Sequence, residues 1–332
     1  MANFIADVSV APTWLWIAFC TGIFLLLLVD LSLFGKGAHK VSRKTALFES
    51  GIWIGLALIF NLWFGFTYGR ELGLEFLTGY LVEKSLSVDN LFVILLIFSS
   101  FRIPDAYQHR VLFYGVLGAI VLRAFFIILG AQLLHLFHWI LYVFGAFLVF
   151  TGIKMWLAAG KEADLEANPA LKWVRRSFAI SPNYDGERFF TRFDGKRMAT
   201  PLLVVVLLIG IVDVVFAVDS IPAIFAITTD PFIVLTSNVF AILGLRAMYF
   251  LLAGVHEKFH LLPYGLSLVL VLIGTKMLLI DIYKIPVAWS LVATGIILAV
   301  TMILSLCIKP KSDQPHGAFP FDAKSDDEAP KT

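Results

Sequence analysis

The chain has 332 residues, a formal net charge of +2 and a strongly apolar composition. Hydrophobic residues make up 59% and charged residues 15%, and the mean hydropathy is +0.87. A soluble globular domain has about 25% charged residues. The composition therefore excludes that class and predicts an integral membrane protein, and the near-neutral charge gives no reason to expect nucleic acid as a partner.

Nine apolar stretches are long enough to cross a bilayer, which takes about 20 residues. They lie at residues 12–34, 48–67, 76–99, 111–133, 138–158, 201–227, 232–254, 263–281 and 286–308. The first stretch is too long to be a cleaved signal peptide. The sequence thus predicts an all-α, polytopic membrane protein with about nine transmembrane helices.

The distribution of Lys and Arg between the connections predicts the orientation. If the N-terminus lies outside, the inner connections carry 19 of these residues and the outer connections carry 2. Basic residues concentrate on the cytoplasmic side of membrane proteins. We therefore expect the N-terminus outside, the C-terminus in the cytoplasm, and membrane lipid around the helices.

Two segments of the chain resemble each other. The acidic motif at 83–90 corresponds to the one at 213–220, and Arg123 corresponds to Arg246. Further matched positions are Phe137-His138 with Phe259-His260, Tyr142 with Tyr264, and Gly152 to Met155 with Gly274 to Met277, the last at an offset of 122 residues. Each copy covers three predicted helices. Since three is odd, the second copy enters the membrane from the opposite side, as in the inverted repeats of secondary transporters.

This repeat divides the chain into six parts. They are the N-terminal helices (1–68), the first repeat (69–158), a cytoplasmic loop (159–200), the second repeat (201–282), the last helix (283–308) and a cytoplasmic tail (309–332). The tail combines acidic residues with Ser, Pro and Lys, a composition typical of disorder.

Four carboxylates fall inside the predicted spans: Glu83, Asp89, Asp213 and Asp219. A charge in the bilayer costs several kcal/mol and usually marks an ion path or a proton relay. The six-residue spacing within each pair puts the two acids about 9 Å apart along a helix and roughly 120° around it. We therefore expect a kink or an unwound turn, for which Pro222 is the candidate in the second copy.

Further residues extend this candidate site. Asn90, Ser220 and Asn238 could add neutral oxygens, and Asp30 and Glu49 could line a cytoplasmic entrance or be interfacial only. An all-oxygen shell suits Mn²⁺, Mg²⁺ or Ca²⁺ rather than Cu⁺ or Zn²⁺. The alternative is that the acids form structural ion pairs with basic residues within the spans. Those basic residues are Arg123, Arg246, Lys84 and Lys276.

Residues 256–260 match the metalloprotease motif H-E-x-x-H, with His256 and His260 as zinc ligands and Glu257 as the base. The motif lies in a short connection, Pro263 follows soon after, and the matching part of the first repeat has no glutamate. We therefore interpret it as chance or structural and do not expect an enzyme.

The segments 83–93, 216–228 and 238–250 resemble the TerC family of bacterial integral membrane proteins, in particular its Alx branch. The resemblance covers residues 12 to 308. It implies the LysE-type transporter superfamily, a bacterial inner membrane and export of Mn²⁺. The site residues carried over by the match are Glu83, Asp89, Asp213 and Asp219, with Asn90 and Asn238 in support.

The resulting hypothesis is a secondary transporter that exports Mn²⁺ as its substrate and holds no resident cofactor. Protons would return on the same carboxylates, because crowded acids can exchange a cation for protons. Two alternatives are a membrane scaffold or insertion factor, whose function would depend on the 159–200 loop, and the membrane metalloprotease.

Overall fold

The computed structural model describes most of the membrane part of the chain. The described residues are 9–34, 43–101, 103–137, 139–159, 180–181, 185–193, 196–252, 261–283 and 285–308. The side chains of Asp30 and Asp89, the motif at 256–260 and the tail at 309–332 lie outside this description. The predicted disorder of the tail and the interpretation of the H-E-x-x-H motif as chance or structural therefore stay predictions.

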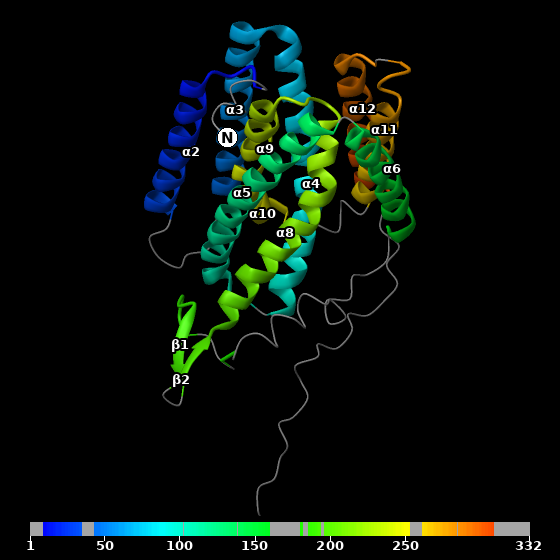
Figure 1. Ribbon diagram of the computed structural model, residues 1–332. Helices are drawn as coiled ribbons and strands as arrows, with labels where there is room; N and C mark the ends of the chain where they lie inside the picture. Colours follow the sequence, from blue (N-terminus) through cyan, green and yellow to red (C-terminus); the bar gives the residue numbers. More distant parts are fainter. Residues whose placement is uncertain are drawn as a thin grey trace, which may run out of the picture.

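Long helices dominate the structure (Figure 1). The first five are α2 (Thr13–Phe34), α3 (Arg43–Tyr68), α4 (Arg70–Ser100), α5 (Asp105–Leu136) and α6 (Ile140–Ala158). The later ones are α8 (Pro201–Phe225), α9 (Pro231–Leu243), α10 (Leu245–Leu252), α11 (Leu262–Leu278) and α12 (Val287–Cys307). Each of the nine predicted stretches overlaps a helix, and the seventh is divided between α9 and α10 by Gly244.

A multi-pass helical membrane protein is confirmed at this level. Among the described residues, six helical segments are long and apolar enough to cross a membrane, with α9 and α10 taken together as one of them, and two shorter apolar segments are Thr13–Val29 and Leu262–Leu278. Helix α4 is absent from both groups and carries Glu83, Lys84 and Asp89 in its middle. The count of nine crossings therefore stays a prediction.

The sequence did not predict the hairpin of β1 (Phe190–Phe193) and β2 (Lys196–Ala199), which lies within the polar loop. The strands are antiparallel, with Phe190 opposite Ala199. Thr200 follows β2 directly, and Pro201 then begins α8, because proline at the first helical position sacrifices no helix hydrogen bond. The hairpin is thus attached to the end of α8, as Figure 1 shows.

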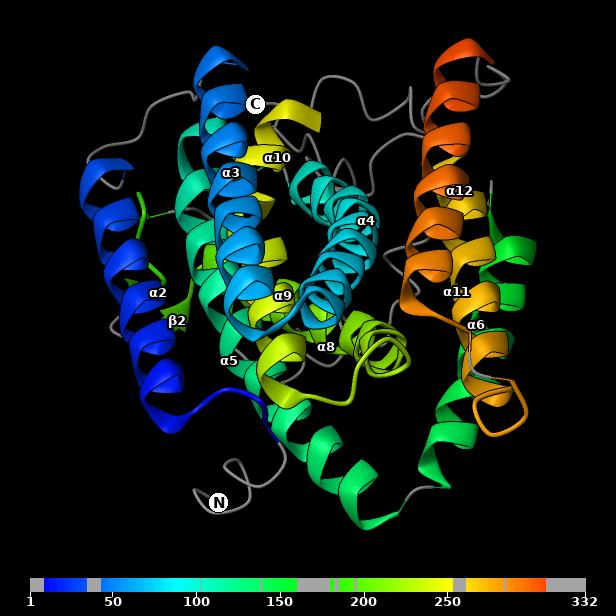
Figure 2. The same cartoon turned by 90° about the horizontal axis from the view of Figure 1, so that it is seen from above.

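Helix α4 lies at the centre of the bundle. It packs against α9, α3 and α8, and the view from above shows α4 surrounded by these helices (Figure 2). Helices α6, α11 and α12 pack together on one side of α4, and α12 contacts α4 directly. A cluster of buried and half-buried aromatic side chains joins α2, α3, α4 and α9 at one end of the bundle. It contains Phe19, Phe60, Phe64, Phe76, Phe232 and Phe240.

Helices α6 and α11 make a reciprocal contact through small residues. A Cβ on Gly274 would lie 2.7 Å from the carbonyl oxygen of Gly145, and a Cβ on Gly152 would lie 2.8 Å from that of Ser267. Gly274 and Ser267 are the residues 122 positions after Gly152 and Gly145. Each position of one helix thus contacts the counterpart of the other position, which is the mark of a two-fold relation. The inverted repeat stays a prediction, and this contact supports it.

Candidate functional site

The site lies where α4 meets α8. Glu83 on α4 is fully buried and Asp213 on α8 is 7% exposed. Ser87 lies one helical turn after Glu83, and Ser220 lies two turns after Asp213, so each pair shares a face of its helix. The two helices thus bring one carboxylate from each repeat to their contact.

Arg123 on α5 bridges the two carboxylates and is 1% exposed. Its Nε lies 3.3 and 3.2 Å from the two oxygens of Asp213, and its Nη2 lies 3.0 Å from Oδ1. Its Nη1 donates to Oε1 of Glu83 and, at 3.2 Å, to the hydroxyl of Ser220. The guanidinium is therefore the cation between Glu83 and Asp213. For these two acids, the structure shows the ion pairing that the sequence analysis gave as an alternative to metal binding.

Several buried polar atoms on α4 and α9 have no hydrogen-bond partner among the described residues. They are Oε2 of Glu83, Oγ of Ser87 and both polar side-chain atoms of Asn238 on α9, and all three residues are fully buried. An unsatisfied buried polar group costs about 1–3 kcal/mol, so a group of them calls for an explanation.

Helices α4 and α9 run parallel, which places Asn238 at the level of Glu83. A Cβ on Gly79 of α4 would lie 3.1 Å from Oγ of Ser237, and Nζ of Lys84 donates to the carbonyl of Ala241 at 3.1 Å. Asn238 lies between these two contacts along α9. Its unpartnered amide is therefore within about one helical turn of Glu83 in height.

Asp219 lies apart from the two acids joined by Arg123. It accepts a hydrogen bond from Thr151, and the charge acting on it is that of Lys154, both on α6. The expected unwound turn is wrong, since α4 and α8 run as unbroken helices over the acidic motifs, with Pro222 inside the last turn of α8. In an unbroken helix, Asp213 and Asp219 point in directions roughly 120° apart.

The other candidate residues fall into separate pairs. Glu49 on α3 and Arg246 on α10 form a buried ion pair, with 3.4 Å between Oε2 and Nη2. Lys276 on α11 interacts electrostatically with Glu75 on α4. Among the residues whose side chains are described, no three of His, Cys, Asp or Glu lie close enough together to hold a metal ion.

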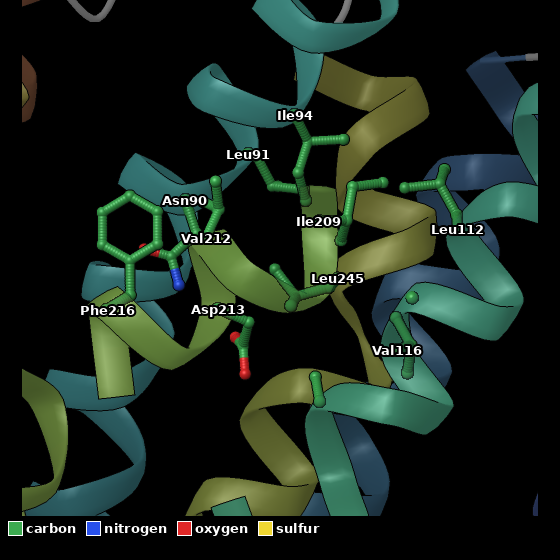
Figure 3. Close-up of a pocket in the computed structure, with 12 residues that line it drawn as sticks. Asn90, Leu91, Ile94, Leu112, Val116, Ile209, Val212, Asp213, Phe216 and Leu245 are labelled. Atoms are coloured by element: carbon green, nitrogen blue, oxygen red, sulfur yellow. The ribbon is translucent and has the colours of Figure 1, made fainter. Parts of the chain in front are cut away.

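A narrow cavity reaches the site between α4, α5, α8 and α10. Its accessible volume is about 20 Å³, which is room for about one water molecule. Its walls are mainly apolar, and the two polar side chains labelled in Figure 3 are Asn90 and Asp213. The cavity lies toward the end of the bundle where α4 ends and α5 and α8 begin, the predicted cytoplasmic end.

Comparison with known proteins identifies the family. Residues 68–313 match the family model described as integral membrane protein TerC family. The chain belongs to the TerC family. This result confirms the resemblance seen in the acidic motifs.

The similarity to individual relatives extends over nearly the whole chain. An uncharacterized membrane protein of Myxococcus xanthus is 51% identical over 298 residues, which covers 90% of this chain and 93% of the relative. A protein of Escherichia coli (strain K12) named "Putative membrane-bound redox modulator Alx" is 51% identical over 318 residues, covering 93% and 99%. A membrane protein of Rickettsia felis is 41% identical over 298 residues, covering 90% and 99%. No solved structure matches the chain significantly.

Sequence reasoning named Arg123 as a possible ion-pair partner of the acids without assigning it particular carboxylates, and it did not include Ser87 in the candidate site. The available signal was the helical spacing of Ser87 from Glu83, which places both side chains on one face.

Proposed function

We propose that this TerC family protein exports a divalent metal cation through the site at the contact of α4 and α8, and that Mn²⁺ is its preferred substrate. The observation that carries the proposal is the buried pair of Glu83 and Asp213, together with the buried side chains of Ser87 and Asn238, which lack partners among the described residues. Intramembrane acids of this kind mark ion pathways and proton relays.

The chemistry of the donors favours a hard cation. Glu83, Ser87, Asn90, Asn238 and Asp213 offer carboxylate, hydroxyl and amide oxygens, which suit Mn²⁺, Mg²⁺ and Ca²⁺. Asp89 and Asp219 complete the proposed set of acids, and Asp30 and Glu49 form the proposed approach from the cytoplasm. Mn²⁺ is preferred because the family resemblance implies it, and the ion is substrate rather than resident cofactor.

Export of a dication from a cell with a negative interior needs a source of free energy. Moving one charge across the membrane against 100 mV costs about 2.3 kcal/mol, so a dication leaving a cell with a negative interior costs about 4.6 kcal/mol. The return of two protons would cancel this electrical cost. Proton antiport is therefore part of the proposal.

The proposed transport cycle is alternating access between the two repeats. The reciprocal contact of α6 and α11 supports a two-fold relation in which the halves rock about a central site. The narrow cavity with Asn90 and Asp213 in its wall supports a path from the cytoplasmic end. In the proposed topology, the protein spans a bacterial inner membrane with its N-terminus on the outer side and its C-terminus in the cytoplasm.

Other functions make different predictions. A scaffold or insertion factor predicts that neutral replacement of the acids is harmless, whereas changes in the 159–200 loop destroy function. The metalloprotease reading predicts that His260→Ala eliminates the activity. A function like that named for the Escherichia coli relative, redox modulator, would predict an effect of this protein on the redox state of the cell.

Uptake of Mn²⁺ into inverted membrane vesicles tests the proposal. Vesicles with the wild-type protein are expected to accumulate Mn²⁺ when their lumen is acidic, and Asp89→Asn, Asp219→Asn and Glu83→Gln are expected to abolish the uptake. Arg110→Gln, in a half-exposed ion pair with Glu187, serves as the control and keeps it. If Glu83→Gln and both aspartate variants retain wild-type uptake, the site is wrong.

A further inference from the structure

We infer that the two central acids have different roles: Glu83 binds the ion together with Ser87 and Asn238, whereas Asp213 is the permanent counter-ion of Arg123. The inference rests on the proposed function and deepens it by dividing the acidic set. It starts from which oxygen atoms of the two acids remain free.

Both oxygens of Asp213 are occupied by Arg123. Nε contacts Oδ1 and Oδ2 at 3.3 and 3.2 Å, and Nη2 contacts Oδ1 at 3.0 Å. Two guanidinium nitrogens facing one carboxylate form the strong, geometrically specific kind of ion pair. A metal ion bound to Asp213 would have to displace this contact or lie close to a like charge, and either is unfavourable.

Glu83 is held less completely. A single nitrogen of Arg123, Nη1, reaches Oε1, and the same nitrogen also donates to Ser220. Oε2 has no partner among the described residues, although the side chain is fully buried. Glu83 therefore keeps one carboxylate oxygen available for a ligand.

Two further buried polar side chains near this height have no hydrogen-bond partner among the described residues. Ser87 follows Glu83 by one turn on the same face of α4, and Asn238 lies on α9 within about one helical turn of Glu83 in height. All three side chains are fully buried and contribute a carboxylate, a hydroxyl and an amide oxygen. These are the donor types that Mn²⁺ and other hard dications accept.

The role of Arg123 follows from this division. Paired with Asp213 it forms an internally neutral unit, and its Nη1 limits how far Glu83 can turn toward α8. If Asp213 loses its charge, the guanidinium has Glu83 as its remaining carboxylate in the cluster and closes on the ion-binding acid. Loss of Asp213 is then harmful through Arg123, not through a missing ion ligand.

A double-mutant cycle on Mn²⁺ flux in proteoliposomes separates the two roles. Asp213→Asn alone is expected to reduce the flux at least about tenfold, and adding Arg123→Gln is expected to restore it to within about threefold of wild type. Glu83→Gln is expected to abolish flux in both backgrounds. Arg110→Gln, the same chemical change on the same helix, is the control.

The outcomes are separable. No flux from the wild-type protein contradicts the proposed function. Flux from the wild type with a double variant as inactive as Asp213→Asn contradicts the division of roles, and so does full flux from Asp213→Asn alone. The double variant removes both charges together, so it remains testable even if one single variant does not fold.

Asn238→Leu provides a second test, because a structural role and an ion-binding role of Asn238 predict different changes in stability and in the KM for Mn²⁺. Replacing an unpartnered buried amide with an apolar side chain is expected to keep or raise the melting temperature. If Asn238 binds the ion, the KM for Mn²⁺ rises at least about tenfold in this stable variant. An unchanged KM would overturn the assignment of Asn238.

Discussion

Gly274→Ala tests the contact between α6 and α11, which joins the two repeats. The added Cβ would lie 2.7 Å from the carbonyl oxygen of Gly145, 2.9 Å from Cβ of Leu148 and 2.9 Å from the amide nitrogen of Val149. Two of these atoms belong to the backbone and cannot rotate away. The helices must therefore separate, and we expect this overpacking to cost about 1–3 kcal/mol.

Thermal unfolding of the purified protein in detergent measures this cost. We expect the melting temperature of Gly274→Ala to fall by about 2–10 °C, and Gly152→Ala, whose Cβ meets the Ser267 carbonyl at 2.8 Å, to fall similarly. Gly295→Ala in α12 is the matched control, because nothing lies within 4 Å of its Cβ. Equal melting temperatures for Gly274→Ala and Gly295→Ala would refute the close packing.

Three further predictions concern charges. Arg123→Met leaves Glu83 and Asp213 buried without their cation, and it should lower the free energy of unfolding by about 3–5 kcal/mol. Adding Glu83→Gln and Asp213→Asn should recover most of this loss. Chemical unfolding measures the loss and the recovery, and an absence of recovery would contradict the ion pair. Burial raises the pKa of Asp230, the N-cap of α9, so its ionised form carries a penalty at neutral pH that is relieved as the pH falls through the raised pKa. The melting temperature of the wild type should therefore rise relative to Asp230→Asn on acidification, and a constant difference would count against this. Arg110→Gln breaks an ion pair whose side chains are 38% and 36% exposed, and it should change stability by no more than about 1 kcal/mol in the same assay.

The apolar runs predicted the positions of the helices, because a long apolar stretch is visible directly in the sequence, and each of the nine runs overlaps a helix. The number of membrane crossings stays a prediction. The offset of 122 residues matched Gly152 with Gly274, and in the structure both glycines lie in the contact of α6 with α11, Gly152 against Ser267 and Gly274 against Gly145. The hairpin at 190–199 was not predicted, since its two four-residue strands contain Arg192, Lys196 and Arg197 and show little alternation of apolar and polar residues.

The site was predicted in part. Glu83 and Asp213 correspond between the repeats and meet in space, and Arg123 joins them. Asp219 faces α6 instead, because α8 continues as a regular helix past Pro222. A six-residue spacing cannot reveal whether a helix is broken, and the break occurs elsewhere, at Gly244 between α9 and α10.

Asn238 illustrates what a sequence cannot supply. Its amide type suggested a possible ligand, but the parallel packing of α4 and α9 is needed to bring it level with Glu83. Likewise, nothing in the sequence distinguishes Asp213, with both oxygens held by Arg123, from Glu83, which keeps one oxygen free.

The most direct measurement is Mn²⁺ flux into proteoliposomes containing the purified wild-type protein or Glu83→Gln. We expect flux through the wild type, competition by other hard dications, and background flux through Glu83→Gln with an unchanged melting temperature. Equal flux through both proteins, or none through the wild type, would contradict a cation pathway built on this buried glutamate.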